Sequence, residues 1–162
     1  YREFMGLVKE YDISPAGLKL EITESAVIMD VPKQAALIEK LQAEGFVVEM
    51  DDFGSGYSSL NTLKDIPVDI LKLDMKFMEK SKNTKRSADI VQMVVAMADK
   101  LGMPVIAEGV ETKEQADFLG RIGCDIIQGY YYAKPMSMEE FEQLLNKYPY
   151  RDIVQKGIGN DI

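Results

Sequence analysis

Histidine is absent from this sequence and cysteine occurs once, and these two scarcities exclude several kinds of site. Without histidine there is no Ser-His-Asp triad and no imidazole acting as general acid or base. The single Cys124 cannot form an intrachain disulfide or a thiolate zinc centre, which fits a reducing, cytoplasmic compartment. Any metal site must therefore use oxygen ligands, which suits hard cations such as Mg²⁺ or Mn²⁺.

Long apolar runs are also lacking. No stretch approaches the roughly 20 apolar residues that span a bilayer, and no signal-peptide pattern opens the chain. The net charge of −8 argues against binding to DNA or RNA duplexes, or to anionic membranes, through bulk electrostatics. An anionic substrate stays compatible with this charge, since bound cations reverse the local field.

Short apolar strands alternate with capped helices along the chain. The predicted strands cover residues 18–22, 46–50, 68–73, 104–107 and 125–128. Helices are predicted at residues 32–44, 59–64 and 87–101. Two more are predicted, one after the Thr112–Gln115 capping box and one from Ser137 to a point before Pro149. Apolar strands of this kind indicate a parallel α/β sheet.

Five strand–helix units are fewer than a complete (β/α)₈ barrel of about 250 residues contains. The sequence therefore predicts a partial TIM-like barrel, and a smaller doubly wound sheet is the alternative. Residues 149–162 show weak periodicity and are predicted to form a loosely held C-terminal tail.

Polar side chains stand at the end of every predicted strand. In parallel α/β folds these ends share one face, where function gathers. An acid, amide or lysine at all five ends is hard to explain as ordinary surface. The residues are Glu21, Glu24, Asp51, Asp52, Lys72, Asp74, Glu108, Glu111 and Gln128.

The adjacent pair Asp51–Asp52 is the most informative of these. Neighbouring carboxylates repel each other unless a cation lies beside them, and one of them can bridge two metals. The glycine-rich loop that follows lets backbone approach a ligand. The alternative is an Asx-type turn in which Asp52 caps that loop.

Lys72 interrupts an apolar strand, so its ammonium is expected to face acids or a phosphate. A lysine that extends its head group to solvent is the alternative. Glu108 suits a second metal ion or a base for an attacking water, while Glu111 can simply begin the next helix. For Glu21 the alternative is an exposed strand terminus, and for Gln128 a hydrogen-bonding turn.

Five segments, in this order and spacing, resemble the EAL family of cyclic-di-GMP-specific phosphodiesterases. They read LKLEITES, DDFGSGYSSL, PVDILKLD, VIAEGVET and GCDIIQGYYYAKP. The resemblance covers nearly all of residues 7 to 148, so that residues 1–148 are identified as the C-terminal part of an EAL domain. It implies a modified TIM barrel that hydrolyses cyclic di-GMP to linear pGpG with two Mg²⁺ or Mn²⁺ ions. It also implies that residues 1–12 form the helix before the first of these segments.

The resemblance also implies roles for individual residues. Glu21 and Asp51 would bind the first metal ion, Asp52 and Glu108 the second. Lys72 would position the nucleophilic water or stabilise charge, and Glu108 would also act as a base. Residues expected to position substrate or loops are Glu24, Phe53, Gly54, Ser55, Gly56, Glu111, Gln128 and Pro135. The Glu-Ala-Leu motif and a following Asn, two further first-metal ligands in the family, do not occur in these 162 residues.

Two functions follow from this resemblance. The first is a cyclic-di-GMP phosphodiesterase domain that is weakly active or inactive alone. The alternative is a non-catalytic module that binds cyclic di-GMP or dimerises. An exposed sheet edge also predicts self-association, for example as a homodimer. The parent protein is expected to carry sensor or cyclase domains and to be cytoplasmic, or anchored to a membrane through other domains.

Overall fold

Five parallel strands form the centre of the computed structural model, which describes residues 1–54, 60–75 and 84–147. The strands lie in chain order, without the reversal that a doubly wound sheet contains. The predicted partial TIM-like barrel is therefore confirmed. The strands are β1 (Lys19–Thr23), β2 (Val47–Phe53), β3 (Ile70–Asp74), β4 (Val105–Glu108) and β5 (Ile126–Ile127).

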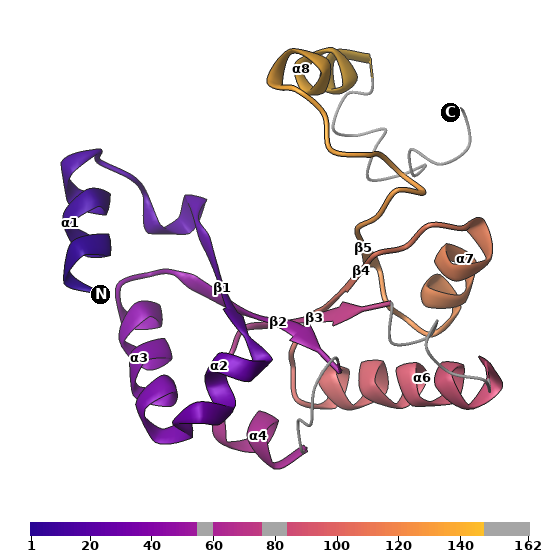
Figure 1. Cartoon of the computed structure of the whole chain (residues 1–162), viewed down its shortest axis with the longest axis horizontal. Helices are drawn as coiled ribbons and strands as arrows, with labels where there is room; N and C mark the ends of the chain where they lie inside the picture. The colour runs from indigo at the N-terminus through magenta and orange to yellow at the C-terminus, as the bar shows by residue number, and fades with distance from the viewer. Residues whose placement is uncertain (55–59, 76–83, 148–162) are drawn as a thin grey trace.

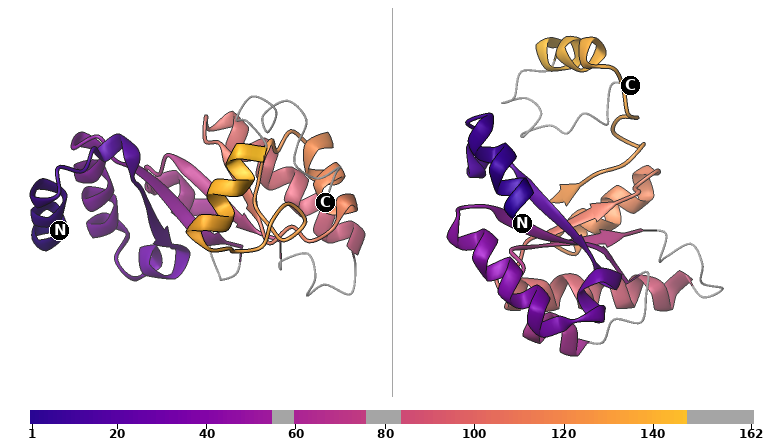
Figure 2. Two further views of the ribbon diagram at one scale, coloured as in Figure 1. Left: turned by 90° about the horizontal axis from the view of Figure 1, so that it is seen from above. Right: turned by 60° about the vertical axis from the view of Figure 1, so that its left-hand side comes forward.

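Helices connect the strands and cover one side of the sheet. They are α1 (Arg2–Glu10), the 3₁₀ turn η1 (Pro15–Gly17), α2 (Glu24–Met29), α3 (Val31–Ala43), α4 (Leu60–Asp65), α6 (Thr84–Lys100), α7 (Lys113–Arg121) and α8 (Met138–Lys147). Figures 1 and 2 show α2, α3, α4 and α6 on one side of the sheet, while α8 stands apart on the other side. None of the described helices is long and apolar enough to cross a membrane.

The two faces of the sheet differ in polarity. On the helix-covered face Val48, Met50, Leu71, Leu73 and Ala107 are at most 2 % exposed and pack into the core. Because side chains alternate along a strand, the residues between them point to the opposite face. That face carries charged side chains, and it is where the candidate site lies.

Several element boundaries differ from the sequence predictions. β2 continues through Phe53 instead of ending at residue 50, since an extra residue is accommodated between Met50 and Phe53 opposite β3. β3 begins at Ile70, two residues later than predicted. α2 was not predicted at all, because it follows β1 directly, without a glycine or proline between them.

Two predicted helix caps are confirmed. Thr112 Oγ1 accepts from the Gln115 amide at 3.2 Å, while Gln115 Oε1 accepts from the Thr112 amide at 3.1 Å. At α8 the Ser137 amide donates to Glu140 Oε2 at 2.9 Å, and the Glu140 amide donates to Ser137 Oγ at 3.3 Å. The predicted tail, and the loop positions Ser55 and Gly56, lie outside the described residues.

Candidate functional site

The ammonium group of Lys72 joins three carboxylates from three other strands. Its Nζ lies 2.5 Å from Glu21 Oε1 on β1, 3.2 Å from Asp51 Oδ1 on β2 and 3.0 Å from Glu108 Oε1 on β4. Lys72 itself is 5 % exposed. Consecutive parallel strands bring these residues together, since their carboxyl ends open on one edge of the sheet.

These contacts change the proton affinities of two of the groups. Burial alone lowers the pKa of Lys72, but its contacts with the carboxylates of Glu21, Glu108 and Asp51 outweigh burial and raise the pKa above its ordinary value. Burial raises the pKa of Glu108, and Asp51 raises it further, against the lowering effect of Lys72. Lys72 is therefore a permanent cation, whereas Glu108 takes up a proton more readily than an exposed glutamate does.

The Asp51–Asp52 pair sits at an irregular point of β2. Asp52 has a φ of 59°, in the left-handed region that non-glycine residues rarely adopt. Such backbone costs of the order of 1–3 kcal/mol and is concentrated at functional sites. Asp51 Oδ1 is buried and, although close to Lys72, has no partner with hydrogen-bond geometry. The alternative of a turn capped by Asp52 stays untested, since the described segment ends at Gly54.

Glu24 holds the beginning of the loop that follows the aspartate pair. It is 2 % exposed at the first position of α2, and its Oε2 accepts from the Gly54 amide at 2.9 Å. Phe53, one residue before Gly54, is 6 % exposed and anchors the end of β2 in the core. The carboxylate of Glu24 therefore joins α2 to the carboxyl end of β2.

Gln128 is held beside the end of β4 by backbone hydrogen bonds. Its amide donates to the Ala107 carbonyl at 2.8 Å, and its carbonyl accepts from the Val110 amide at 3.2 Å. Gly129 must lack a side chain, because a Cβ there would lie 2.0 Å from the Val110 carbonyl oxygen. The Tyr131 amide donates to the Val110 carbonyl at 3.0 Å, so hydrogen bonds fix this segment on both sides of Gly129.

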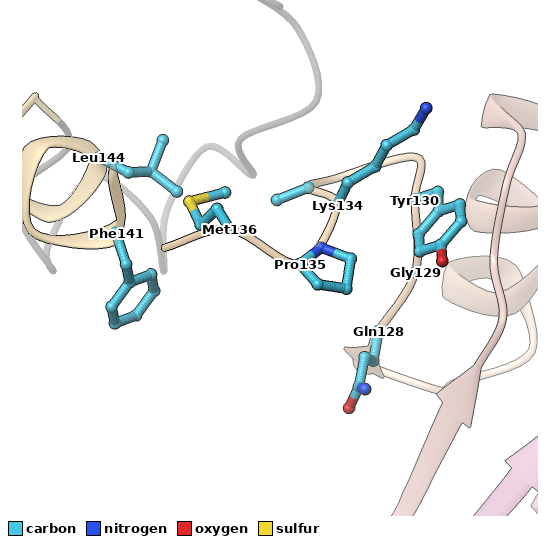
Figure 3. Close-up of a pocket in the computed structure, with 9 residues that line it drawn as sticks. Gln128, Gly129, Tyr130, Lys134, Pro135, Met136, Phe141 and Leu144 are labelled. Carbon is cyan, nitrogen blue, oxygen red and sulfur yellow. The ribbon is translucent and has the colours of Figure 1, made fainter. Parts of the chain in front are cut away.

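Gln128 and Pro135 line a cavity of about 350 Å³ between the segment after β5 and α8. In Figure 3 both lie on one side of it, with Phe141 and Leu144 of α8 on the other. Both residues are exposed. Glu111 is exposed as well, and its backbone amide donates to Gln115 Oε1 at 2.8 Å. The three acids that contact Lys72 do not include Glu24, Asp52 or Glu111.

The donor set suits a hard cation. Among the described residues no three acidic, histidine or cysteine side chains form a ready-made metal site. Three carboxylates instead surround the Lys72 ammonium. Three acids against one lysine leave the site negative, and Asp51 Oδ1 has no hydrogen-bond partner in its buried position. Oxygen donors, one of them buried and unsatisfied, fit a hard divalent cation.

Two acids of this region were given no role by the sequence. Asp74 ends β3 in register with Glu108, and its Oδ1 would lie 3.5 Å from a Cβ at Gly109. Glu49 lies in the middle of β2, is 3 % exposed and pairs with Lys19 at 3.0 Å. The signal that could have revealed Glu49 is the one that revealed Lys72, a charge inside an otherwise apolar strand.

The sheet order and the acids at its strand ends define a TIM-like α/β protein with an acid-lined site. The family model of the EAL domain matches residues 2–135, and the chain belongs to this family. It is 40% identical over 131 residues to the cyclic di-GMP phosphodiesterase NbdA of Pseudomonas aeruginosa, which covers 81% of this chain and 17% of that protein. It is 39% identical over 135 residues to the cyclic di-GMP phosphodiesterase RocR of the same organism. That alignment covers 83% of this chain and 34% of RocR. The chain thus spans between 17% and 34% of the length of these two relatives.

Solved structures give the same family. The EAL domain of Mycobacterium smegmatis DcpA superimposes with a TM-score of 0.79 and 39% identity, over 90% of this chain and 66% of that one. A calcium and cyclic di-GMP complex of Klebsiella pneumoniae BlrP1 superimposes with a TM-score of 0.73 and 30% identity. The alignment covers 82% of this chain and 34% of that one.

Proposed function

We propose that this chain contributes the catalytic face of a phosphodiesterase that hydrolyses cyclic di-GMP to pGpG. The observation that carries the proposal is the Lys72 ammonium bound by Glu21, Asp51 and Glu108 at adjoining strand ends. In this reaction a water oxygen forms a bond to phosphorus and a P–O3′ bond breaks. One water proton goes to a base, and the departing 3′-oxygen takes up a proton.

Each group at the site suits one of these requirements. Lys72 remains protonated, so it is suited to neutralise charge that develops on phosphate oxygens. Glu108, with its raised pKa, is suited to accept the proton of the attacking water. Glu24 fixes the Gly54 amide, two residues after the aspartate pair, by accepting its hydrogen bond.

Metal dependence is part of the proposal. Glu21 and Asp51 would hold a first Mg²⁺ or Mn²⁺ ion, and Asp52 and Glu108 a second. Bound there, these ions would lower the pKa of water and neutralise phosphate charge. The oxygen-only donor set and the calcium complex of the BlrP1 relative support this assignment.

A second candidate is binding of cyclic di-GMP without turnover. It is favoured by the absence, among the described residues, of a ready-made three-ligand metal site. The two candidates make different predictions about the product, although both require the carboxylates around Lys72.

One experiment separates the two candidates. The purified chain is incubated with cyclic di-GMP and Mn²⁺, products are resolved by reverse-phase chromatography, and binding is measured in parallel by equilibrium dialysis. Hydrolysis predicts pGpG from the unmodified chain and none from Asp51→Asn. The matched control is Asp117→Asn, which removes a carboxylate from the exposed ion pair with Lys113. Saturable binding without pGpG supports the second candidate, and neither binding nor product refutes both.

We also propose partners for the chain. The first and last strands of the described sheet each pair with a single neighbour, so each offers an edge for pairing with a second copy. Sedimentation velocity tests this, and a monomer at all concentrations contradicts it. A bifunctional diguanylate cyclase/phosphodiesterase relative, MucR, supports fusion to a cyclase domain.

A further inference from the structure

The buried carboxylate of Glu49 has no role in the proposed reaction. It lies in the middle of β2, two residues before Asp51, and β alternation places both on the charged face of the sheet. Directly across from it in the β1–β2 register is Glu21. Two like charges opposite each other on neighbouring strands repel, so each of these acids needs its own cation.

Two cations on the same sheet meet this need. Lys19 and Lys72 are the only cationic residues within the five strands. Lys19 Nζ lies 3.0 Å from Glu49 Oε1, while Lys72 Nζ lies 2.5 Å from Glu21 Oε1. The lysines and glutamates thus alternate across the face, one ammonium for each of the two opposed carboxylates.

Lys19 and Glu49 attract each other by charge, but no hydrogen bond fixes the geometry of the pair. Glu49 Oε1 is buried and has no partner with hydrogen-bond geometry, although Lys19 stands within ion-pair distance. The side chain of Lys19 is 53% exposed and that of Glu49 is 4% exposed. Lys19 therefore brings compensating charge from the solvent side to an acid that water does not reach.

We propose that Lys19 is a positioning residue for the Lys72 site, because it keeps the Glu49 carboxylate from competing with Glu21 for Lys72. A buried carboxylate that loses its cation must find another or become protonated. Glu49 pairs in register with Ile70 on β3, so Lys72 is its diagonal neighbour, two residues further along that strand. Diagonal neighbours lie about 7–8 Å apart, within reach of a glutamate and a lysine side chain.

The proposal rests on the proposed function, since the Lys72 site is the one it protects. A purely structural ion pair predicts something else: removal of Lys19 would lower stability but leave the environment of Lys72 unchanged. The test therefore needs a readout at Lys72 that does not depend on hydrolysis.

The test uses the full chain labelled with ¹⁵N-lysine and follows the Nζ resonance of Lys72, assigned by its loss in Lys72→Arg. The variants are Lys19→Met, the double variant Lys19→Met/Glu49→Gln, and the control Lys113→Met. The control matches closely: Lys113 is 58% exposed and lies 2.8 Å from Asp117. Mn²⁺ affinity is measured on the same samples by calorimetry, and pGpG formation by chromatography.

We expect Lys19→Met to shift the Lys72 resonance and to lower both Mn²⁺ affinity and kcat by about tenfold, the low end of the loss seen when a residue that supports metal ligands is removed. The double variant is expected to restore all three, and Lys113→Met to change none. An unmoved Lys72 resonance in Lys19→Met, or a double variant as impaired as the single one, overturns the proposal.

Two other outcomes are also decisive. If Lys19→Met does not fold, the double variant decides alone: a Lys72 resonance that differs from the unmodified chain refutes the proposal. If the unmodified chain forms no pGpG, the proposed hydrolysis fails. The Nζ shift and the Mn²⁺ titration then still report whether Lys19 controls the pairing of Lys72.

Discussion

Replacing Lys72 by methionine removes one cation from the centre of three carboxylates while keeping most of the side-chain volume. The change leaves Asp51 and Glu108, whose side chains are 20% and 19% exposed, facing each other without a counterion. Glu21 is 52% exposed and can turn to water. The loss of stability should therefore come chiefly from the two partly buried acids, Asp51 and Glu108.

The magnitude can be worked from these exposures. Removing one partner of a buried ion pair costs about 3–5 kcal/mol, because the other charge stays buried and uncompensated. The exposed Glu21 adds little, since solvent screens it. We therefore expect Lys72→Met to lower the free energy of unfolding by about 3 kcal/mol at pH 8. For a chain of this size the melting temperature should fall by about 10 °C.

The loss should shrink in acid. In the folded variant Asp51 and Glu108 repel each other, so the native state binds a proton more readily than the unfolded state does, and its stability rises as pH falls. Urea titrations followed by circular dichroism at pH 8 and pH 5.5 measure the difference. Adding Mn²⁺ should recover more stability in Lys72→Met than in the unmodified chain, because a divalent cation replaces the missing charge.

The control is Lys113→Met, which breaks an ion pair of two exposed side chains and should change stability little. The reasoning is refuted if Lys72→Met is no more destabilising than this control. It is also refuted if the loss is the same at both pH values, since uncompensated buried carboxylates must respond to protons.

Three further changes test other parts of the site. Glu108→Gln should remove the gain in stability that the unmodified chain shows as pH falls through the raised pKa of Glu108 toward 4.5, measured by urea titration. Gly129→Ala should lower the free energy of unfolding by about 2 kcal/mol, because the added Cβ meets the Val110 carbonyl and the backbone must shift. Glu24→Ala should speed hydrogen exchange at the Gly54 amide, which loses its acceptor, as measured by NMR.

Each of these changes has a matched comparison. Asp117→Asn should leave the acid response in place, since that carboxylate is exposed. Gly120→Ala, in α7 where no atom lies within 4 Å of the new Cβ, should stabilise the chain by about 0.5–1 kcal/mol. Glu142→Ala, on exposed α8, should leave Gly54 exchange unchanged. A variant that behaves like its control would contradict the corresponding contact.

The sequence was most informative about the strands and the polar residues that end them. Apolar runs predicted all five strands, and parallel order then requires that Glu21, Asp51 and Glu108 approach one edge of the sheet. The acidic surroundings of Lys72 were predicted from the cost of desolvation, because an ammonium inside an apolar strand needs acids close by. These inferences needed only local pattern and the geometry of parallel sheets.

Other features depend on contacts that no local pattern records. The extra residue in β2 and the positive φ of Asp52 arise from pairing with β3, which is distant in the chain. α2 begins behind Thr23, whose side chain makes no capping hydrogen bond, so the usual start signal is missing. The pairing of Lys19 with Glu49 was likewise invisible, because its register is set by the whole β1–β2 pair.

The charge balance at the strand ends links cation binding to substrate binding. Glu21, Asp51 and Glu108 surround one ammonium, so the site as it stands repels a phosphodiester. Binding of cyclic di-GMP should therefore be weak without a divalent cation and stronger with Mn²⁺. Thermodynamic linkage then requires that cyclic di-GMP raise the affinity for Mn²⁺ by the same factor. Calorimetric titrations in both orders measure the two factors, and an affinity for cyclic di-GMP that is indifferent to Mn²⁺ would show that the carboxylates do not face the phosphates.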